Sequence, residues 1–368
     1  MLIAIISYLG IYTVWIGRIV VLGLNRQRKK ELEYASEKGV SPNEITVLIP
    51  FRNEEKRISG LLKSIKNLKR LPNTCVFIDD HSTDATVKLI EESLKGIPFE
   101  IISLKEGEGK KMAIRAGAKQ VQTEYTLTWD ADVCVGPNYF EYLSSLEEAD
   151  MYVLPAIFDS KSFTEHLYEF DVVLGNAFNV GVSGWKRPIF ASGANLLFKT
   201  ETFNTLDDID SHVHISSGDD TFLLRDFFRS NADVRLHSSP DVAVQTESPK
   251  SFREYINQRL RWIGKTNALN DKLNTGIAYM QLLFTLAFIG LLITSCILGL
   301  WLLLVPLIAG KIIVDLLLFY PYFNRINRLR TFALLPIAEL SFPLLSIILV
   351  VLMPFYSPKW KGRTIINK

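Results

Sequence analysis

The segment ITVLIPFRNEEKRISGLLKSIKNLKRLPNTCVFIDD, residues 45–80, carries the pattern of a parallel α/β unit. It opens with a β-branched apolar run from Ile45 to Ile49, and it closes with a second apolar run that leads into Asp79 and Asp80. Between the runs, apolar residues recur every three or four positions from Ile58 to Leu68, the spacing of an amphipathic helix. The segment therefore predicts a strand, a helix and a second strand.

The alternation of strands and helices continues along the chain. Strand-like runs at Phe99–Leu104 and Tyr125–Trp129 flank a helical stretch from Met112 to Val121. In a mostly parallel sheet, ligands bind beyond the carboxyl ends of the strands, at the point where the strand order reverses. Five charged residues are expected at that edge: Arg52, Glu54, Asp79, Asp80 and Asp130.

Composition limits the classes of protein to consider. The formal net charge is only +2, so no strongly basic field indicates nucleic acid as a partner. The three cysteines have no paired spacing, which favours a reduced, cytoplasmic catalytic part. The sequence contains no HExxH zinc pattern and no Walker A loop.

The first 24 residues are apolar apart from Arg18 and are long enough to cross a bilayer. A signal peptide would have a basic start and a small-residue cleavage site. We therefore interpret residues 1–24 as a membrane anchor. The basic run from Arg26 to Lys30 predicts that the following segment is cytoplasmic.

The other apolar region covers residues 276–356, with about three hydrophobic segments. The last of them, from Phe332 to about Phe355, contains Glu339 and two prolines. Two interpretations of this segment stay open, a membrane span and an interfacial or re-entrant position.

The predicted organisation has six parts. They are an anchor (1–24), a basic cytoplasmic linker (25–44), a catalytic domain (45–247), an interfacial helix (248–272), a C-terminal membrane region (276–356) and a basic tail (357–368).

Asp130 and Asp132 stand two residues apart at the end of a predicted strand. Hard oxygen ligands of this type suit Mg²⁺ or Mn²⁺, which keep space for phosphate oxygens and water. The alternative is a turn in which both carboxylates accept hydrogen bonds from backbone N–H groups. The residues alone leave both interpretations open.

The segment Asp79-Asp80-His81-Ser82-Thr83-Asp84 is rich in strand-ending and helix-capping residues. We expect Asp84 to cap the next helix. Asp79 or Asp80 either accepts a hydrogen bond from a nucleobase, lies near a metal, or only ends the strand. Lys110 follows a glycine-containing loop before a helix, so it either contacts a pyrophosphate or is a solvated lysine.

Asp219 and Asp220 precede an apolar run and are expected at the start of a helix, where ionised carboxylates are favoured. A carboxylate there could act as a general base on an acceptor hydroxyl, or it could be an ordinary N-cap.

Gln258, Arg261 and Trp262 fall on a predicted amphipathic helix from Ser251 to Gly264. Because this helix directly precedes the membrane segments, an interfacial position is expected. Arg261 and Trp262 could in addition bind a diphosphate or stack on an acceptor.

Taken in order, these motifs resemble those of the membrane-anchored glycosyltransferases of family 2. The resemblance runs from about Ile45 to Trp262, and the joint occurrence of the motifs in one order makes it specific. It rests on Ile49-Pro50-Phe51-Arg52-Asn53-Glu54-Glu55, Asp79-Asp80-x-Ser82-x-Asp84, Gly109-Lys110-x-x-Ala113, Asp130-x-Asp132, Gly218-Asp219-Asp220 and Gln258-x-x-Arg261-Trp262.

The resemblance implies a GT-A-like α/β fold with a mostly parallel sheet, flanked by N- and C-terminal transmembrane helices. It also implies that Asp220 is the catalytic base, beside Asp219 where the family often has Glu. Asp132, with Asp130, would bind Mg²⁺ or Mn²⁺. The residues implied for the donor are Pro50, Arg52, Glu54, Asp79, Asp80, Lys110, Asp130, Gln258, Arg261 and Trp262.

The implied activity is the inverting transfer of a sugar from a nucleotide-sugar to a lipid or glycan hydroxyl. Among nucleotide-sugars, a UDP-sugar is the expected donor. The implied location is a bacterial inner membrane, with the catalytic domain in the cytoplasm. Two alternatives remain. One is a processive polysaccharide synthase, which carries the same Gln-x-x-Arg-Trp motif, and the other is a non-catalytic module that binds nucleotide-sugar.

One further segment, Ser162 to Trp185, is rich in large apolar residues. It forms either an apolar approach to the bilayer or part of the protein core.

Overall fold

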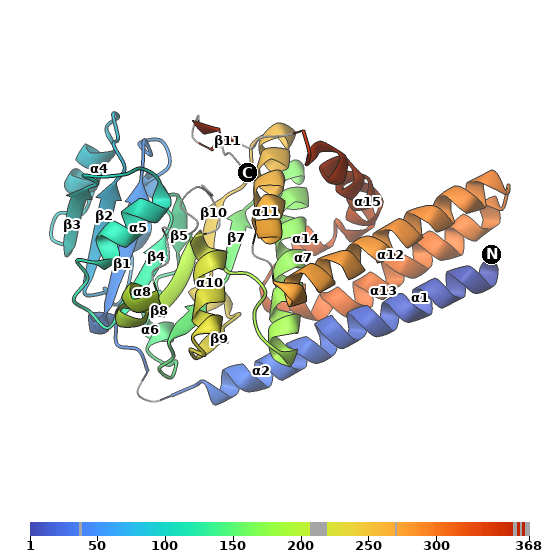
Figure 1. Cartoon of the computed structure of the whole chain (residues 1–368), viewed down its shortest axis with the longest axis horizontal. Helices are drawn as coiled ribbons and strands as arrows, with labels where there is room; N and C mark the ends of the chain where they lie inside the picture. Colours follow the sequence, from blue (N-terminus) through green and yellow to red (C-terminus); the bar gives the residue numbers. More distant parts are fainter. Residues whose placement is uncertain (37–38, 207–218, 269–270, 356–358, 361–362, 365–368) are drawn as a thin grey trace. The chain divides into compact units, whose positions relative to one another are not determined.

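The chain folds as shown in the computed structural model of Figure 1. The structure describes all residues except 37–38, 207–218, 269–270, 356–358, 361–362 and 365–368. Contacts divide the chain into two compact units. The helical unit comprises Met1–Lys29, Ser160–Ile189 and Ser248–Asn367, and the sheet unit comprises Lys30–Asp159 and Phe190–Glu247.

The sheet unit is built on a seven-stranded sheet with the order β3-β2-β1-β4-β8-β6-β9. Its strands are β1 (Ile45–Phe51), β2 (Thr74–Asp79), β3 (Phe99–Ser103), β4 (Tyr125–Trp129), β6 (Met151–Val153), β8 (Asn195–Lys199) and β9 (Val234–Leu236). Strands β1 to β4 are parallel, and β8 runs antiparallel to both β4 and β6. The predicted mostly parallel sheet is therefore confirmed.

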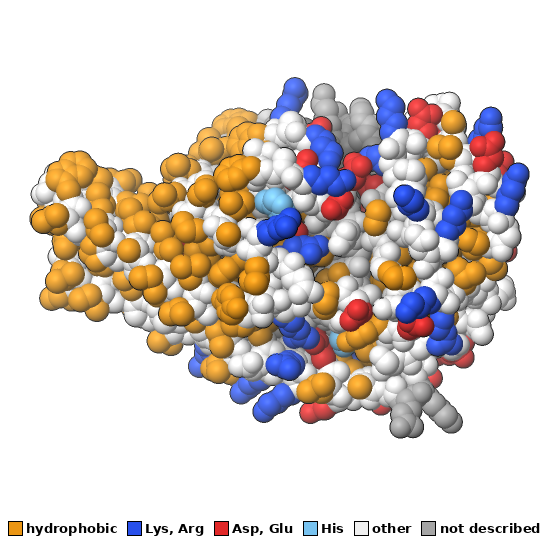
Figure 2. Space-filling model, turned by 180° about the vertical axis from the view of Figure 1, so that it is seen from behind, with side chains coloured by type: hydrophobic (Ala, Val, Ile, Leu, Met, Phe, Trp, Pro, Cys, Tyr) orange, Lys and Arg blue, Asp and Glu red, His pale blue; other side chains and the backbone are white. Residues whose placement is uncertain are grey.

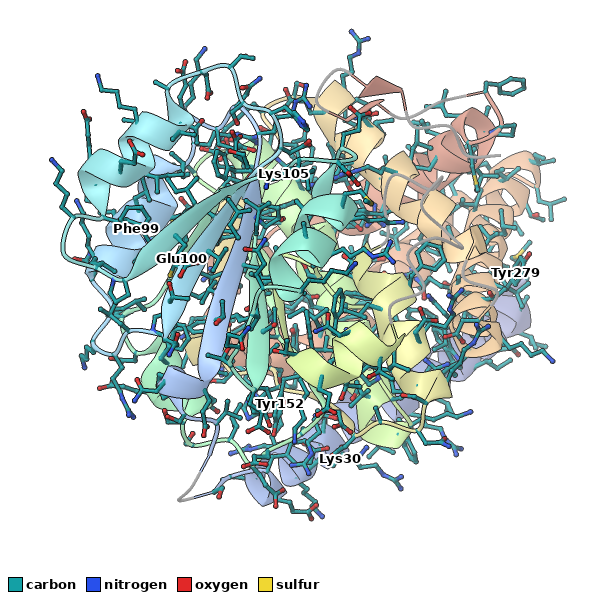
Figure 3. All side chains as sticks on the ribbon, turned by 60° about the vertical axis from the view of Figure 1, so that its left-hand side comes forward. Lys30, Phe99, Glu100, Lys105, Tyr152 and Tyr279 are labelled. Carbon is teal, nitrogen blue, oxygen red and sulfur yellow. The ribbon has the colours of Figure 1, made fainter. Side chains whose placement is uncertain are left out.

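The order of the strands places a switch point between β1 and β4. From β1 the chain moves outward through β2 to the edge strand β3, where Phe99 and Glu100 are labelled in Figure 3, and it then returns to the other side of β1. All seven residues of β1 are buried, as expected for a strand at the centre of a covered sheet. The carboxyl ends of β1, β2 and β4 consequently share one edge.

Short helices and a small second sheet complete this unit. The helices are α3 (Ser59–Lys66), α4 (Thr86–Ser93), α5 (Lys110–Ala118), α6 (Tyr139–Leu143), α8 (Thr200–Leu206) and α10 (Asp219–Arg229), with 3-10 turns η2 (Pro42–Glu44) and η3 (Pro240–Val242). The second sheet has the order β5-β10-β7, from β5 (Val133–Val135), β10 (Val244–Glu247) and β7 (Ala156–Asp159). Helix α3 buries Leu61, Leu62 and Ile65, which belong to the predicted apolar stripe.

The helical unit contains the apolar ends of the chain. Its elements are α1 (Leu2–Ile16), the π-helical η1 (Gly17–Leu22), α2 (Gly23–Glu33), α7 (Phe163–Trp185), α11 (Phe252–Ala268), α12 (Lys272–Ile297), η4 (Trp301–Leu303), α13 (Leu304–Arg325), α14 (Leu329–Phe332) and α15 (Leu335–Leu352). A short hairpin, β11 (Lys359–Trp360) and β12 (Arg363–Thr364), follows.

Four helical segments among the described residues are long and apolar enough to cross a membrane: Leu2–Glu33, Lys272–Ile297, Trp301–Arg325 and Leu335–Leu352. Hydrophobic side chains cover much of the surface of these helices in Figure 2. Large residues such as Leu283 and Val305 are well exposed there, which suits contact with lipid rather than water. Transmembrane helices at both ends agree with the predicted fold class.

Helix α7 lies within the helical unit, although its sequence falls inside the predicted catalytic domain of 45–247. It packs against the N-terminal helix through glycines. A Cβ on Gly181 would lie 2.5 Å from the Ile19 carbonyl oxygen, and one on Gly184 would lie 2.0 Å from that of Gly23. Small residues permit this close backbone approach between helices. Of the two interpretations of the segment from Ser162 to Trp185, the many buried residues of α7 favour a place in the core of the helical unit, and an approach to the bilayer stays a prediction.

Four polar side chains meet inside the group of apolar helices. Lys311 of α13 donates to Asp315 at 2.7 Å, contacts the Glu339 carboxylate of α15, and lies 3.3 Å from the hydroxyl of Tyr12 in α1. The Tyr12 hydroxyl donates to Asp315 at 2.8 Å. Ionisable groups among apolar helices are costly unless they pair with one another. The network therefore accounts for the presence of Glu339 within a candidate span.

Replacing Lys311 with Met should destabilise the helical unit by about 3–5 kcal/mol, because Asp315 and Glu339 would lose their buried counter-charge. Thermal unfolding of the full chain in detergent measures the effect. Lys250→Met is the matched control, since the Lys250 side chain is 57% exposed and its pairing with Glu165 should contribute little. If both variants unfold at the wild-type temperature, the network does not hold the helices together.

Candidate functional site

The carboxyl ends of β1, β2 and β4 meet at the switch point, and the predicted polar residues follow them. The N–H of Asp80 donates to the Phe51 carbonyl at 2.9 Å, which joins the loops after β1 and β2. Asp130 directly follows β4. Residues that are far apart in sequence are thus neighbours at one edge, as the sequence predicts.

The loop after β1 and the loop after β2 are joined by reciprocal hydrogen bonds. The N–H of Asn53 donates to the Ser82 hydroxyl at 3.1 Å, and the Asn53 side chain accepts from the Thr83 N–H at 2.8 Å. Asn53 has a positive φ of 51°, which Asn tolerates better than most residues. The two loops form one rigid surface.

Asp84 caps the start of α4, as expected. Its carboxylate accepts from the N–H of Thr86 at 3.0 Å and from that of Glu55 at 3.1 Å. Partial burial alone would raise the pKa of Asp84, but hydrogen bonds from Thr86 and Glu55 outweigh it and lower the pKa below its ordinary value. Asp84 therefore serves the structure of the loop.

Asp80 is 2% exposed and holds the loop that precedes α5. One oxygen accepts from the Gly109 N–H at 3.0 Å, and the other lies 3.8 Å from the guanidinium of Arg52. Gly109 has a φ of 92°, a conformation that suits glycine. Asp80 thus fixes the backbone directly before Lys110. Asp79 accepts from the Ser82 N–H at 2.9 Å, and Pro50 lies within β1.

Lys110 and Asp130 form a direct ion pair at the end of β4. Asp132 is paired in turn with Arg57, at 3.2 Å. Each of the two aspartates predicted for a metal therefore pairs with a cation. In the described part of the chain, no group of three or more His, Cys, Asp or Glu side chains could hold a metal unaided. The donor set fits Mg²⁺ or Mn²⁺ that takes its remaining ligands from phosphate oxygens and water.

Arg57 is a site residue that the sequence analysis does not single out. It contacts Glu54 at 2.7 Å as well as Asp132, and Glu54 is 4% exposed. Burial alone would lower the pKa of Arg57, but the two carboxylates outweigh it and raise the pKa, so the guanidinium stays charged. The signal in the sequence is its spacing of three residues from Glu54, which is the spacing of one helical turn.

Asp220 lies at the N-terminal end of α10, where the first N–H groups favour a carboxylate. One oxygen accepts from the Gly193 N–H at 3.0 Å. The other accepts from the N–H of Thr221 at 2.7 Å and from its hydroxyl at 3.0 Å. The carboxylate is thus held at both oxygens. Asp219 is the first residue of α10, and its side chain lies outside the described part of the structure.

Gly193 lies close to both Lys110 and Asp220. A Cβ at this position would lie 3.1 Å from the Lys110 amine and 3.5 Å from Cβ of Asp220. Lys110 therefore reaches into the space beside Gly193, between Asp130 and Asp220. The sequence patterns described above do not predict this close approach.

Gln258, Arg261 and Trp262 lie on α11 in the helical unit. This confirms the predicted helix over that motif. Within the unit, the Arg259 guanidinium lies over the Trp262 ring, 5.6 Å from its centroid. The contact of these residues with a donor stays a prediction.

Comparison with known proteins agrees with this geometry. Residues 46–227 match the family model described as Glycosyl transferase family 2. This chain carries a glycosyltransferase family 2 domain over these residues. The match begins at β1 and ends within α10, so it includes the edge that carries Asp130 and Asp220.

Two curated relatives from staphylococci align with part of the domain. Teichoic acid poly(glycerol phosphate) polymerase of Staphylococcus epidermidis is 28% identical over 43% of this chain, and poly-β-1,6-N-acetyl-D-glucosamine synthase of Staphylococcus aureus is 30% identical over 37%. The alignments cover only 22% and 33% of those relatives' own lengths.

One solved structure resembles almost the whole chain. The mannosyltransferase PcManGT from Pyrobaculum calidifontis matches with a TM-score of 0.57, covering 94% of this chain and 99% of its own, at 18% identity. A likeness at this identity establishes the fold. The predicted GT-A-like fold with flanking helices is confirmed.

Replacing Gly193 with Ala should lower turnover of a nucleotide-sugar donor by roughly 10- to 100-fold, because the new methyl group would lie 3.1 Å from the Lys110 amine and push it from its position. Steady-state kinetics on the purified full chain measures the effect. Gly136→Ala is the matched control, since a Cβ there meets nothing within 4 Å. Equal activity of the two variants would contradict the close approach at Gly193.

Proposed function

We propose that this chain is an inverting glycosyltransferase that moves a sugar from a nucleotide-sugar to a hydroxyl of a membrane lipid. The observation that carries the proposal is the meeting of Lys110, Asp130 and Asp220 around Gly193 at the switch point of a family 2 domain. A cation, a carboxylate beside it and a second, fixed carboxylate are what a single displacement on a nucleoside diphosphate requires.

Asp220 is the general base. It takes the proton from the acceptor hydroxyl while the acceptor oxygen forms a bond to the anomeric carbon. The bond from that carbon to the diphosphate oxygen breaks on the opposite face, and the configuration inverts. The Gly193 N–H and the Thr221 hydroxyl orient the carboxylate for this step, since both donate to it.

Lys110 stabilises the negative charge that develops on the nucleoside diphosphate. Its position at the start of α5 adds the backbone N–H groups of a helix N-terminus to the same task. Mg²⁺ or Mn²⁺ held by Asp132 and Asp130 would supply further charge neutralisation. The fold neighbour from Pyrobaculum calidifontis was solved with GDP-mannose and Mn²⁺, which supports a donor and metal of this kind.

The nucleoside is held at the carboxyl ends of β1 and β2 and by the joined loops that follow them, where Pro50, Asp79 and Arg52 lie. We also propose that Arg261 and Trp262 bind the donor or the acceptor, as the Gln-x-x-Arg-Trp motif implies. A UDP-sugar is the first donor to test. A GDP-sugar is the second, because the fold neighbour was solved with GDP-mannose.

A lipid acceptor follows from the chain's own apolar helices. Four helical segments are able to cross a membrane, and the basic run from Arg26 to Lys30 follows the first of them. By the positive-inside rule, the catalytic domain lies in the cytoplasm and works on the inner leaflet.

A processive polysaccharide synthase is the second candidate. The poly-β-1,6-N-acetyl-D-glucosamine synthase of Staphylococcus aureus supports it by name, with 30% identity over 37% of this chain. A membrane module that binds nucleotide-sugar without turning it over is the third, but the fixed Asp220 carboxylate would then have no task.

Asp220→Asn should reduce turnover of a radiolabelled nucleotide-sugar by about 10²- to 10⁴-fold, since the amide cannot accept the proton. Donor affinity, measured by calorimetry, should be retained. Asp226→Asn, on the same helix but paired with Arg225, is the matched control. An active Asp220→Asn enzyme would exclude Asp220 as the base.

The wild-type product identifies the acceptor class in the same assay. Label in the organic phase supports lipid transfer, insoluble polymer supports the synthase, and tight donor binding with no product supports the module.

Chelation with EDTA should abolish turnover, and added Mg²⁺ or Mn²⁺ should restore it. Asp132→Asn should need a higher metal concentration for half-maximal activity, roughly tenfold, because one hard oxygen ligand is lost. Full activity in EDTA would contradict a metal at this site.

A further inference from the structure

Helix α7 carries an aspartate that binds two side chains of α11, the helix of the Gln-x-x-Arg-Trp motif. The Asp171 carboxylate accepts from the Tyr255 hydroxyl at 2.6 Å and lies 3.0 Å from Nε of Arg259. All three residues belong to the helical unit. Their side chains are largely buried, with 13% exposure for Asp171 and 26% for Arg259.

The Tyr255 phenol stays protonated and donates its hydrogen bond to Asp171. The residue is 2% exposed, and its ring stacks on Tyr168 of α7 at a centroid distance of 4.3 Å. Burial, followed by the charge of Asp171, raises the pKa of Tyr255 well above its ordinary value, so the phenol keeps its proton. The contact fixes α11 along its axis and in its rotation.

Arg259 connects Asp171 to Trp262 of the motif. Its guanidinium is bound to Asp171 and lies 5.6 Å from the centroid of the Trp262 ring. A planar cation over an indole restricts the ring, because the ring face attracts the charge. Arg259 is the first of the two unnamed positions of Gln-x-x-Arg-Trp, directly after Gln258, and it joins Asp171 to Trp262.

We propose that Asp171 is a positioning residue, which acts through Arg259 to hold Trp262 in the orientation that the transfer reaction needs. The proposal rests on the role given to Arg261 and Trp262 under the proposed function. In this role Asp171 acts through its contacts with Tyr255 and Arg259. Its task is to fix α11 against α7.

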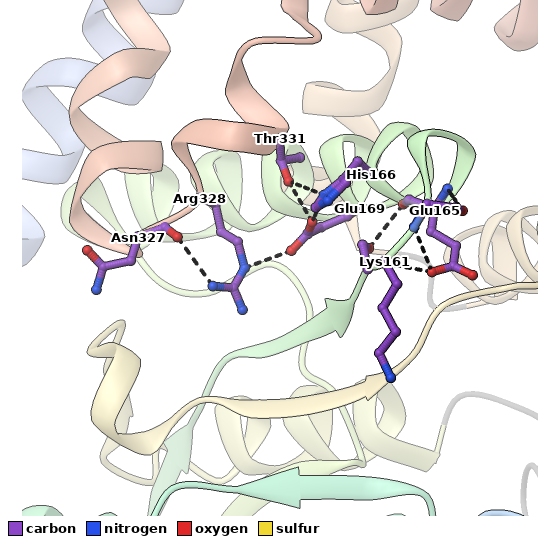
Figure 4. Close-up of polar contacts among 9 residues, drawn as sticks. Lys161, Glu165, His166, Glu169, Asn327, Arg328 and Thr331 are labelled. Carbon is purple, nitrogen blue, oxygen red and sulfur yellow. Dashed lines mark hydrogen bonds and ion pairs between the residues drawn. The ribbon is translucent and has the colours of Figure 1, made fainter.

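A second acidic residue of α7 provides the comparison. Glu169 is 1% exposed and binds α14 instead: it accepts from Nε of Arg328 at 2.7 Å and from the Thr331 hydroxyl at 2.6 Å (Figure 4). His166 lies 3.0 Å from the same carboxylate. Two residues along a helix differ by about 200° in direction, so α7 holds α14 on one side and α11 on the other.

A double-mutant cycle separates positioning from general damage to the fold. Asp171→Asn should lower kcat/KM for the donor by about tenfold in the otherwise wild-type full-length enzyme, but by less than about twofold in a Trp262→Ala background, because both changes remove the same orientation. Arg259→Lys should behave like Asp171→Asn, since lysine cannot keep both the carboxylate contact and the stacking. Glu169→Gln should have the same effect in both backgrounds.

An equal fold loss for Asp171→Asn in the two backgrounds would overturn the proposal and leave the proposed function intact. Wild-type turnover by Trp262→Ala would instead remove Trp262 from the proposed function. Hydrogen exchange then tests whether Asp171 restrains α11. Faster exchange over residues 252–264 in Asp171→Asn, but not in Glu169→Gln, is expected, and unchanged exchange would refute the hold of Asp171 on α11.

Discussion

The pairing of carboxylates with cations is the constraint on which the rest of this structure depends. Asp130 meets Lys110 and Asp132 meets Arg57 at the edge of the sheet, while Asp171 meets Arg259 in the helical unit. Lys311 satisfies two carboxylates among apolar helices. At Lys311, where the partners are nearly fully buried, a charge left without a partner would cost several kcal/mol, so this network also fixes the helices that carry it.

The pairs in the sheet unit differ in purpose from those in the helical unit. At the sheet edge, Asp130 and Asp132 lie beside cations. A diphosphate pairs with cations and a metal pairs with carboxylates, so these residues suit a site that exchanges ion partners when substrate binds. In the helical unit, Glu169 and Asp171 each join α7 to a different helix. There the ion pairs hold helices in position. The proposed function needs both the exchangeable pairs at the sheet edge and the fixed pairs between helices.

Local sequence patterns predicted the elements well, because they reflect short-range geometry. The apolar run at Ile45 became the central strand, and the spacing from Ile58 became a helix with the expected buried face. Asp84 is a cap, as its position before a helix indicates. The predicted domain of 45–247 did not show that α7 groups with the membrane helices, since that grouping depends on glycine contacts with residues near the N-terminus.

The sequence by itself determined the α/β order, the parallel sheet, the apolar ends and the set of aspartates at one edge, because strand and helix periods and hydrophobic length are written in consecutive residues. Only the tertiary structure decided that Arg57 pairs with Asp132, that Gly193 leaves room for Lys110, and that Asp171 holds α11. Those contacts join residues 75 to 88 positions apart through single side chains, and a lone residue leaves no periodic signal in a sequence.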